Sequence, residues 1–312
     1  MNQSFEVSGK ALAVKGRAVV RVCSLRDEYY DFVEDPAAFL RDLKSDSRVK
    51  ADLFTFTQPV PDPEPKFSYH LEYDSAAVVF LSTYDHWWKK QIKDKTRNMV
   101  RKAQKAGVEI RAVEFGDELI RGIHKLYNES PIRQGKRFWH YGKNLETLRR
   151  EHGTFLNQSQ FFGAYYNGEL IGFIKLVHGH GVSNVMNIVA MISHRDKAAT
   201  NALIAKAVEI CAERGVPRLQ YGTGNSRSIG DFKKHHAFEE VRVPRYFVPL
   251  NWKGALALTL GLHRPLDRCL PENWRNWLLG FRARWVAFRY ARRAKSTRAG
   301  ALDQSAEQRA QV

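Results

Sequence analysis

The segment from Tyr127 to Gly142 gathers side chains of several chemical kinds within a short stretch of sequence. It supplies two groups that accept protons, two cations and a flat ring for stacking: Glu129, His140, Arg133, Lys136 and Trp139. Glu129 is our first candidate for a general base, because a carboxyl group buried beside aromatic rings takes up a proton near neutral pH. His140 is the second candidate. The alternative is a loop whose aromatic side chains only pack.

Tyr221 ends an expected strand and is a candidate proton donor, although a tyrosine of the core would look the same in the sequence. His178 and His180 form a pair without a nearby carboxylate motif, so we expect no metal site there. The three cysteines are Cys23, Cys211 and Cys269. They are far apart and odd in number, which indicates a chain without a disulfide framework or zinc site, in a reducing compartment.

A regular series of elements must position these groups. Apolar periodicity and turn residues predict the series strand 108–115, helices 117–129 and 145–152, strands 161–166, 169–177 and 184–192, helix 198–214, strand 218–222, helix 228–236 and strand 241–250. Asn167 and Gly168 lie between two apolar runs and predict a hairpin. We therefore expect an α/β domain over residues 108–250, with a mixed, mostly antiparallel sheet flanked by helices.

The flanking regions differ from this domain. Residues 1–107 are expected to form an α/β region, with helical spacing over 25–43, a strand at 75–82 and a basic helix over 85–106. The basic helix carries Trp88, Ile92, Met99 and Ala103 on one stripe. Residues 251–312 are expected to be a basic, amphipathic helical extension with a disordered tail. Its aromatic stripe between Trp274 and Phe288 is typical of helices that lie on a membrane surface or pack on a domain. Both extensions are thus expected to be rich in helix.

Two local stretches support a family resemblance. Residues 95–108 read Lys-Thr-Arg-Asn-Met-Val-Arg-Lys-Ala-Gln-Lys-Ala-Gly-Val, and this resembles the segment that precedes the catalytic fold in Fem-type peptidoglycan aminoacyltransferases. Residues 168–175 read Gly-Glu-Leu-Ile-Gly-Phe-Ile-Lys, and they resemble the central hairpin of GNAT N-acyltransferases. Together with the order of elements, these stretches indicate a GNAT-like acyltransferase fold.

The resemblance implies acyl-CoA, and acetyl-CoA in particular, as donor. In the family the pantetheine arm lies along the strand that matches residues 188–192, and the pyrophosphate lies at the N-terminus of the following helix. The matching residues here are Val189, Ala190, Met191, Ile192, Arg195, Lys197, Ala198, Ala199 and Thr200. Residues 195–200 read Arg-Asp-Lys-Ala-Ala-Thr, so the two glycines usual in the family are absent.

The family also implies residues after the next strand. Asn225 matches a position that contacts the donor, and Phe232 stands near the position of the family's tyrosine acid. Phe232 and Lys233 together resemble Fem-type proteins, in which the lysine suits a substrate phosphate or the acyl carbonyl. The resemblance assigns the loop of Arg133, Lys136 and Trp139 to acceptor binding.

Composition limits the partners. The chain has 312 residues and a formal net charge of +17, which favours an anionic partner such as a phosphorylated cofactor, nucleic acid or lipid headgroups. No apolar run reaches the length that spans a bilayer. We therefore expect a cytoplasmic protein, with peripheral contact to the inner face of the membrane through its C-terminal extension.

The leading function is an enzyme that moves an acyl group from acyl-CoA to an amine on a cell-envelope or polysaccharide precursor. An aminoacyl-tRNA donor is the nearest alternative, because it would account for the basic helix and the altered loop. A nucleic-acid-binding protein with an inert GNAT-like core is the alternative from another class.

Overall fold

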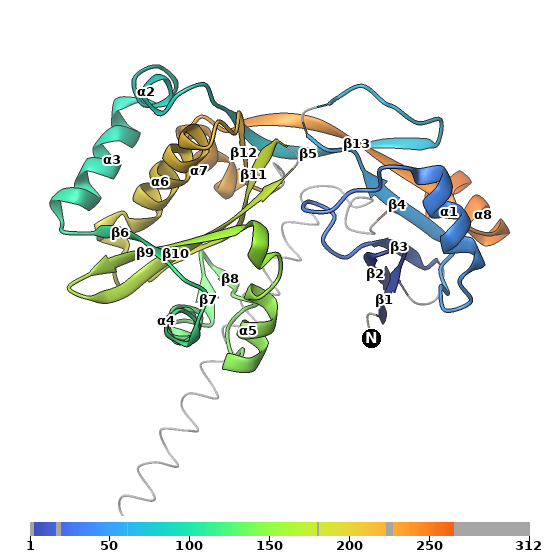
Figure 1. Ribbon diagram of the computed structural model, residues 1–312, viewed down its shortest axis with the longest axis horizontal. Helices are drawn as coiled ribbons and strands as arrows, with labels where there is room; N and C mark the ends of the chain where they lie inside the picture. The colour runs from blue at the N-terminus through green and yellow to red at the C-terminus, as the bar shows by residue number, and fades with distance from the viewer. Residues whose placement is uncertain (1–2, 17–19, 61, 180, 223–226, 265–312) are drawn as a thin grey trace, which may run out of the picture. The chain divides into compact units, whose positions relative to one another are not determined.

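The computed structural model describes residues 3–16, 20–60, 62–179, 181–222 and 227–264, and its main feature is an eleven-stranded sheet (Figure 1). The order of strands in the sheet is β1-β2-β3-β4-β13-β5-β12-β11-β10-β9-β6. Their bounds are β1 Gln3–Val7, β2 Lys10–Lys15, β3 Val22–Leu25, β4 Leu53–Thr57, β5 His70–Phe80, β6 Glu109–Val113, β9 Ser159–Tyr166, β10 Glu169–Gly179, β11 Val182–Ala190, β12 Arg218–Gln220 and β13 Glu239–Pro249. The β3–β4 and β11–β12 pairs are parallel and the other pairs are antiparallel.

The other described elements are helices and one small hairpin, which forms a two-stranded sheet of its own. The helices are α1 Pro36–Ser45, α2 Tyr84–His86, α3 Asp94–Lys105, α4 Asp117–Asn128, α5 Leu145–His152, α6 Ala199–Glu213, α7 Arg227–His235 and α8 Trp252–Thr259. The hairpin pairs β7 Ile132–Arg133 with β8 Lys136–Arg137. Short 3-10 turns cover Leu156–Gln158 and Arg195–Lys197, and a π-helical turn covers Trp87–Gln91.

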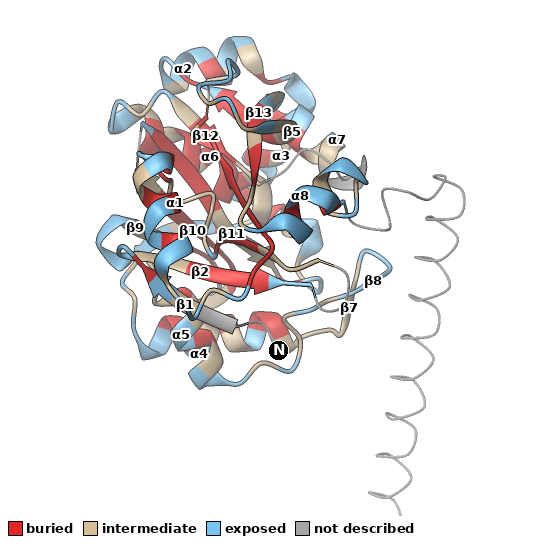
Figure 2. Cartoon of the chain, turned by 90° about the vertical axis from the view of Figure 1, so that its right-hand side faces the viewer, coloured by how far each residue is buried: buried red, intermediate tan, exposed pale blue. Residues whose placement is uncertain are grey.

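The chain divides into two compact units, each of which is described by itself. Of the described residues, the first unit holds those up to 119 and those from 153 to 263, and the second holds residues 120–152 and Arg264. In the first unit, buried residues concentrate in the strands and in α6, as Figure 2 shows. In the second, Tyr127, Leu126 and Leu148 are fully buried.

Local sequence signals explain several elements. Asp35 caps α1 by accepting a hydrogen bond from the N–H of Ala38, and Pro36 begins the helix with its φ already set. Asn167 and Gly168 both have positive φ, as the tight turn of a hairpin requires, and they join β9 to β10. The predicted architecture, a mixed and mostly antiparallel sheet flanked by helices, is confirmed.

The region before residue 107 differs from its prediction in two ways. Five strands, β1 to β5, lie there where the sequence indicated one, so this region is richer in strand than expected, and the helix expected at 25–43 begins only at Pro36. The expected helix over 85–106 is interrupted, because Ile92 is extended at φ −95° and ψ 149°. Trp87, which is fully buried and donates to the carbonyl of His236, therefore replaces Trp88 in the apolar seam.

Most of the C-terminal extension lies outside the described residues. The aromatic stripe between Trp274 and Phe288 lies outside the described residues, and so does Cys269. Of the helices that are described, none combines the length and apolar character needed to cross a membrane. The domain boundaries at residues 107 and 250 stay predictions.

Candidate functional site

Strands β11 and β12 separate from each other in the middle of the sheet. They pair at two positions, Ser183 with Leu219 and Asn184 with Gln220. Beyond this point the chain after β12 remains hydrogen-bonded to β5, because the N–H of Tyr221 donates to the carbonyl of Ala77. Strand β11 remains paired with β10. The described residues therefore leave one edge of β11 without a partner strand after Asn184 (Figure 1).

A β-bulge at the start of this free edge explains the separation. Lys175 pairs with Asn187 and Leu176 pairs with Val185, so Met186 is an extra residue in β11. A bulge bends its strand and increases the local twist. The separation of β11 from β12 thus arises from a specific irregularity of the strand.

The hydrogen-bond pattern of β11 identifies which backbone groups face the free edge. The N–H of Met191 donates to the carbonyl of Ile171 in β10. Because the direction alternates along an antiparallel strand, the peptide groups of Val189 face β10 and those of Ile188 face the free edge. Of the predicted donor-binding residues, Met191 is therefore held by β10 through its N–H, and Ile192 is exposed at the end of the strand.

The loop before α6 contains a left-handed backbone turn, although its sequence lacks the two glycines usual in the family. Ala198 has φ 56° and ψ 29°, the left-handed conformation for which glycine is usual. No side chain caps α6, and the N–H groups of Ala199 and Thr200 have no acceptor among the described residues. Free N–H groups at the N-terminus of a long helix favour an anion.

The two cations of this loop differ in their surroundings. Lys197 lies 3.2 Å from Asp196 and places its ammonium 4.8 Å from the centre of the Tyr166 ring. Arg195 is exposed and has no ion-pair partner among the described residues. Arg195 is thus the cation of this loop that is available for a phosphate.

Buried Lys233 of α7 lies against half-buried Tyr221, which follows the end of β12. The Lys233 ammonium lies 4.6 Å from the centre of the Tyr221 ring, and burial lowers the pKa of Lys233 to about 8. Burial raises the pKa of Tyr221 to about 12, so its hydroxyl keeps its proton at neutral pH. Phe232 lies 4.3 Å from the His236 ring, and Asn225 lies outside the described residues.

The candidate base Glu129 lies in the second unit and is paired with a cation. Its carboxylate accepts a hydrogen bond of 3.1 Å from Arg133, which also donates to the carbonyl of Leu126 and lies 4.7 Å from the Phe138 ring. The sequence predicted an apolar surrounding for Glu129, whereas the structure gives its carboxylate a guanidinium partner.

His140 lies in the same unit and is held in its neutral form. Burial and the ammonium of Lys143 lower its pKa to about 4. Nδ1 of His140 lies 3.1 Å from Lys143, which can only donate, so the proton of the ring is on Nε2. Lys143 also binds both oxygens of Glu151 and lies 4.1 Å from the Trp139 ring. Trp139 is 71% exposed, and Lys136 is exposed in β8, so both stay available to a ligand.

Lys175 is a buried cation that is not among the site residues predicted from the sequence. It is fully buried in β10 and donates to the carbonyl of Thr154 at 2.5 Å, and burial lowers its pKa to about 8. A lysine within the apolar run of β10 is itself the signal that could have identified it. His178 is hydrogen-bonded to Ser183 and Gln160, and His180 lies outside the described residues.

A small hollow lies beside the point where β11 and β12 pair. Its walls include Tyr29, Tyr30, Phe32, Asn184 and Gln220. The two tyrosines belong to the segment between β3 and α1, where the sequence predicted a helix. The N-terminal region thus contributes to the surroundings of the β11–β12 junction.

Comparisons with known proteins agree with this geometry. Residues 120–238 match the family model described as the acetyltransferase (GNAT) family. A search of curated proteins by sequence finds no match.

Solved structures with the same fold are distant in sequence. One is the C-terminal domain of a protein described as a lysylphosphatidylglycerol synthetase from Agrobacterium fabrum, with a TM-score of 0.55 and 14% identity over 83% of this chain and 87% of that chain. Another is L-PGS from Bacillus licheniformis, with a TM-score of 0.53 and 15% identity over 80% of this chain and 84% of that chain. A third is FemX, with a TM-score of 0.52 and 11% identity over 80% of this chain and 86% of that chain. At these identities the similarity shows the fold alone.

Proposed function

Because the chain has a GNAT fold and its residues 120–238 match the GNAT family model, we propose that it is an N-acyltransferase that uses acyl-CoA as donor. The observation that carries the proposal is the separation of β11 from β12 after Asn184, with the bulge at Met186. It provides a backbone edge beside which an extended, amide-containing arm fits. Acetyl-CoA is the first donor to test.

The donor would be held at two places. The amides of the pantetheine arm would pair with the peptide groups of Ile188, which face the free edge. The pyrophosphate would bind the N–H groups of Ala199 and Thr200 at the N-terminus of α6, with Arg195 as a further positive charge. The left-handed Ala198 supports this assignment, because it sets the turn that presents those N–H groups.

The reaction would move an acyl group from sulfur to nitrogen. The amine attacks the thioester carbonyl, its proton passes to a base, and the thiolate leaves and takes up a proton. Glu129 stays the proposed base, and its carboxylate accepts a hydrogen bond from Arg133. Tyr221 would protonate the thiolate, and Lys233 would stabilise the negative charge on the acyl oxygen. His140 is the weaker candidate, because its Nδ1 is occupied by Lys143.

For the acceptor we propose an amine on an anionic envelope or polysaccharide precursor. Two neighbours of the same fold are described as a lysylphosphatidylglycerol synthetase and as L-PGS, and the first name includes phosphatidylglycerol, which is an anionic lipid. Arg133, Lys136 and Trp139 are the proposed acceptor residues, with Lys136 and Trp139 exposed for contact. Peripheral membrane contact through residues 265–312 lies outside the described residues and stays a prediction.

Thermal unfolding with acetyl-CoA and longer acyl-CoAs tests the proposal. A donor present at a hundredfold over its Kd stabilises the folded chain by about 2.7 kcal/mol. The shift should be reduced in Arg195→Ala and retained in Arg41→Ala, which removes an exposed arginine of α1. A chain that no acyl-CoA stabilises, and that transfers no acyl group to a panel of amines, would refute the proposal.

A second candidate donor, aminoacyl-tRNA, is favoured by the surface of the α2–α3 region. Its exposed cations are Lys89, Lys90, Lys93, Lys95, Arg101, Lys102 and Lys105. Arg97, by contrast, turns inward and donates to the carbonyls of Trp88 and Ile92. Loss of transfer activity after RNase treatment, together with reduced tRNA binding by Lys95→Glu and Lys102→Glu, would favour this donor over acyl-CoA.

A further inference from the structure

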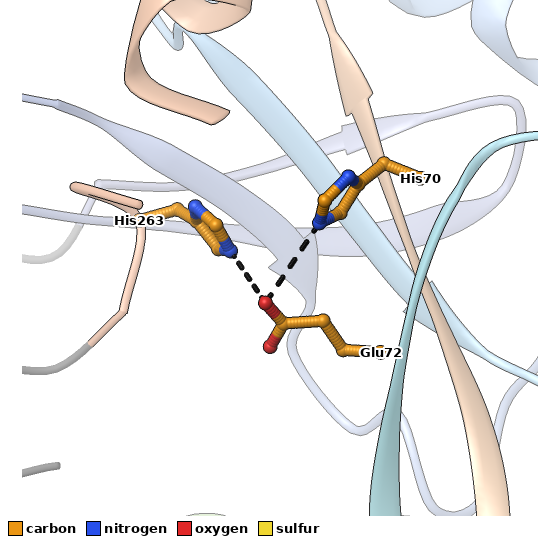
Figure 3. Close-up of side chains that lie close together, drawn as sticks. All are labelled: His70, Glu72 and His263. Atoms are coloured by element: carbon orange, nitrogen blue, oxygen red, sulfur yellow. Dashed lines mark hydrogen bonds and ion pairs between the residues drawn. The ribbon is translucent and has the colours of Figure 1, made fainter. Parts of the chain in front are cut away.

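Three side chains from distant parts of the sequence converge outside the acyltransferase site. His70 and Glu72 belong to β5, and His263 follows α8 (Figure 3). The Oε1 atom of Glu72 lies 2.8 Å from Nε2 of His263 and 3.8 Å from Nε2 of His70. All three ligand atoms lie within 4.8 Å of one another.

The fold explains why the three side chains meet. His70 and Glu72 are two residues apart in a strand and therefore point to the same face of the sheet. The chain turns back after α8, where Gly261 has φ 68° and the N–H of Leu262 donates to the carbonyl of Ala257. His263 is consequently packed 4.7 Å from the Phe247 ring, and its side chain is 1% exposed.

The donor set suits a transition metal. Two imidazole nitrogens and one carboxylate oxygen are the ligands of many three-residue zinc sites. Ligand atoms around a tetrahedral Zn²⁺ are about 3.3 Å apart, given bonds of about 2.0–2.1 Å. The separations of Glu72 Oε1 from Nε2 of His263 and of His70, 2.8 Å and 3.8 Å, lie on either side of this value. A small rotation of the exposed His70 side chain would therefore bring its nitrogen into position for the metal.

The nearest guanidinium is engaged with other carboxylates. Arg245 lies opposite Glu72 in the β5–β13 register, and its guanidinium binds Asp74 and Glu28. The hydrogen bond between His263 and Glu72 does not by itself require a second histidine, so the presence of His70 beside them favours a metal site.

We propose that Nε2 of His70, Oε1 of Glu72 and Nε2 of His263 bind one divalent transition metal of the Zn²⁺ type. The metal would tie the segment after α8 to β5 and leave one coordination position to water. This site is separate from the β11–β12 edge and independent of the proposed acyltransferase function.

Metal binding by the full chain tests the proposal directly. Protein stripped with EDTA is titrated with Zn²⁺ against a chromophoric chelator, and Co²⁺ loading is followed by visible absorption. Wild type should bind one Zn²⁺ tightly and unfold at a higher temperature with the metal. Glu72→Gln and His263→Ala should each weaken binding at least about a hundredfold, above the 10–100-fold loss typical of outer partners. His86→Ala, which removes an exposed histidine of α2, should bind like wild type.

The outcome does not depend on one variant folding. His70→Ala changes a side chain that is 42% exposed, so it should fold, lose tight Zn²⁺ binding and lose the Co²⁺ absorption. Circular dichroism checks the fold of each variant before titration. Wild type without micromolar Zn²⁺ binding, or equal binding by wild type and the folded His70→Ala and Glu72→Gln variants, would overturn the proposal.

Discussion

Two lysines lie where lysine is usually absent. Lys175 is fully buried and Lys233 is 4% exposed, and burial lowers the pKa of each to about 8. An unfolded chain keeps these lysines protonated up to about pH 10.4. Between these values the unfolded state binds more protons, so the free energy of unfolding increases as the pH rises.

Lys175→Met should flatten this part of the stability curve. Removal of one titrating group lowers the slope of unfolding free energy between pH 8 and 10 by up to about 1.4 kcal/mol per pH unit. Urea unfolding at several pH values measures the slope for wild type and variant. Lys206→Met, in which a partly exposed lysine of α6 is lost, is the control and should retain the wild-type slope. An unchanged slope in Lys175→Met would show that Lys175 does not titrate in this window.

Glu129→Gln should lower the rate of acyl transfer at least about a hundredfold, because it removes the proposed base while it retains the shape of the side chain. Steady-state kinetics with the donor identified by thermal unfolding measures the effect. Glu146→Gln alters an exposed carboxylate in the same unit and should react like wild type. A Glu129→Gln enzyme with normal turnover would remove Glu129 from the mechanism.

Residue types in the sequence predicted some of these features and not others. The loop of Glu129 and His140 was recognisable from its composition. The partners were not, because Lys143 reaches His140 and Arg133 reaches Glu129 only in the folded loop. His70, Glu72 and His263 were also missed, since the third residue is separated from the first two by about 190 positions of sequence.

At the scale of elements, the free edge of β11 makes a specific prediction about proline. Ile188→Pro removes an N–H that faces the free edge, so it should weaken donor binding and leave the ladder to β10 intact. Val189→Pro removes an N–H that faces β10 and should destabilise the fold by several kcal/mol. Donor titration and thermal unfolding of the two variants measure the two effects. Equal loss of stability in both variants would contradict the assigned direction of the peptide groups.

Ala198→Gly should stabilise the chain. A left-handed conformation costs an L-residue about 1–2 kcal/mol, and glycine adopts it without this cost. The unfolding temperature should therefore increase, and donor binding should be retained because the turn is unchanged. Ala198→Val should lower the unfolding temperature, as a branched side chain makes the same conformation less favourable. A lower unfolding temperature in Ala198→Gly would indicate that Ala198 leaves the left-handed region in solution.

Elements with strong local signals were predicted well. The β9–β10 hairpin follows from Asn167 and Gly168, and α5 has the predicted bounds, 145–152. Strands β1 to β3 were missed because each has six residues or fewer, too short for a clear alternation, although β1–β2 and β2–β3 are local antiparallel pairs. The break between α2 and α3 was also missed. The carbonyls of Trp88 and Ile92 accept hydrogen bonds from the Arg97 side chain of α3, and the sequence pattern does not show such a contact.

For the whole molecule, buried histidines predict the acid side of the stability curve. Burial is the main cause that lowers the pKa of His140, His178 and His236 to about 4. An unfolded chain protonates histidine near pH 6.5, so between pH 6.5 and 4 the unfolded state binds more protons. Stability should therefore fall as the pH falls through this range.

His178→Gln should make this fall less steep, because glutamine can keep hydrogen bonds to Ser183 and Gln160 without titrating. Urea unfolding between pH 6.5 and 4 measures the slope. His86→Gln, at an exposed position, is the matched control and should retain the wild-type slope. The same slope in His178→Gln and wild type would mean that His178 is already charged at neutral pH or stays neutral in both states.

The free edge of β11 has a consequence for hydrogen exchange. An N–H that faces an unpaired edge lacks the protection that a neighbouring strand gives, although it lies within an eleven-stranded sheet. The amide of Ile188 should therefore exchange with solvent deuterium much faster than that of Val189 in the ligand-free protein. A donor bound along this edge would take the place of the missing strand and should slow exchange at Ile188 while exchange at Val189 stays unchanged. The proposed donor would thus act as an additional strand of the sheet, and its release would expose the edge of β11 again.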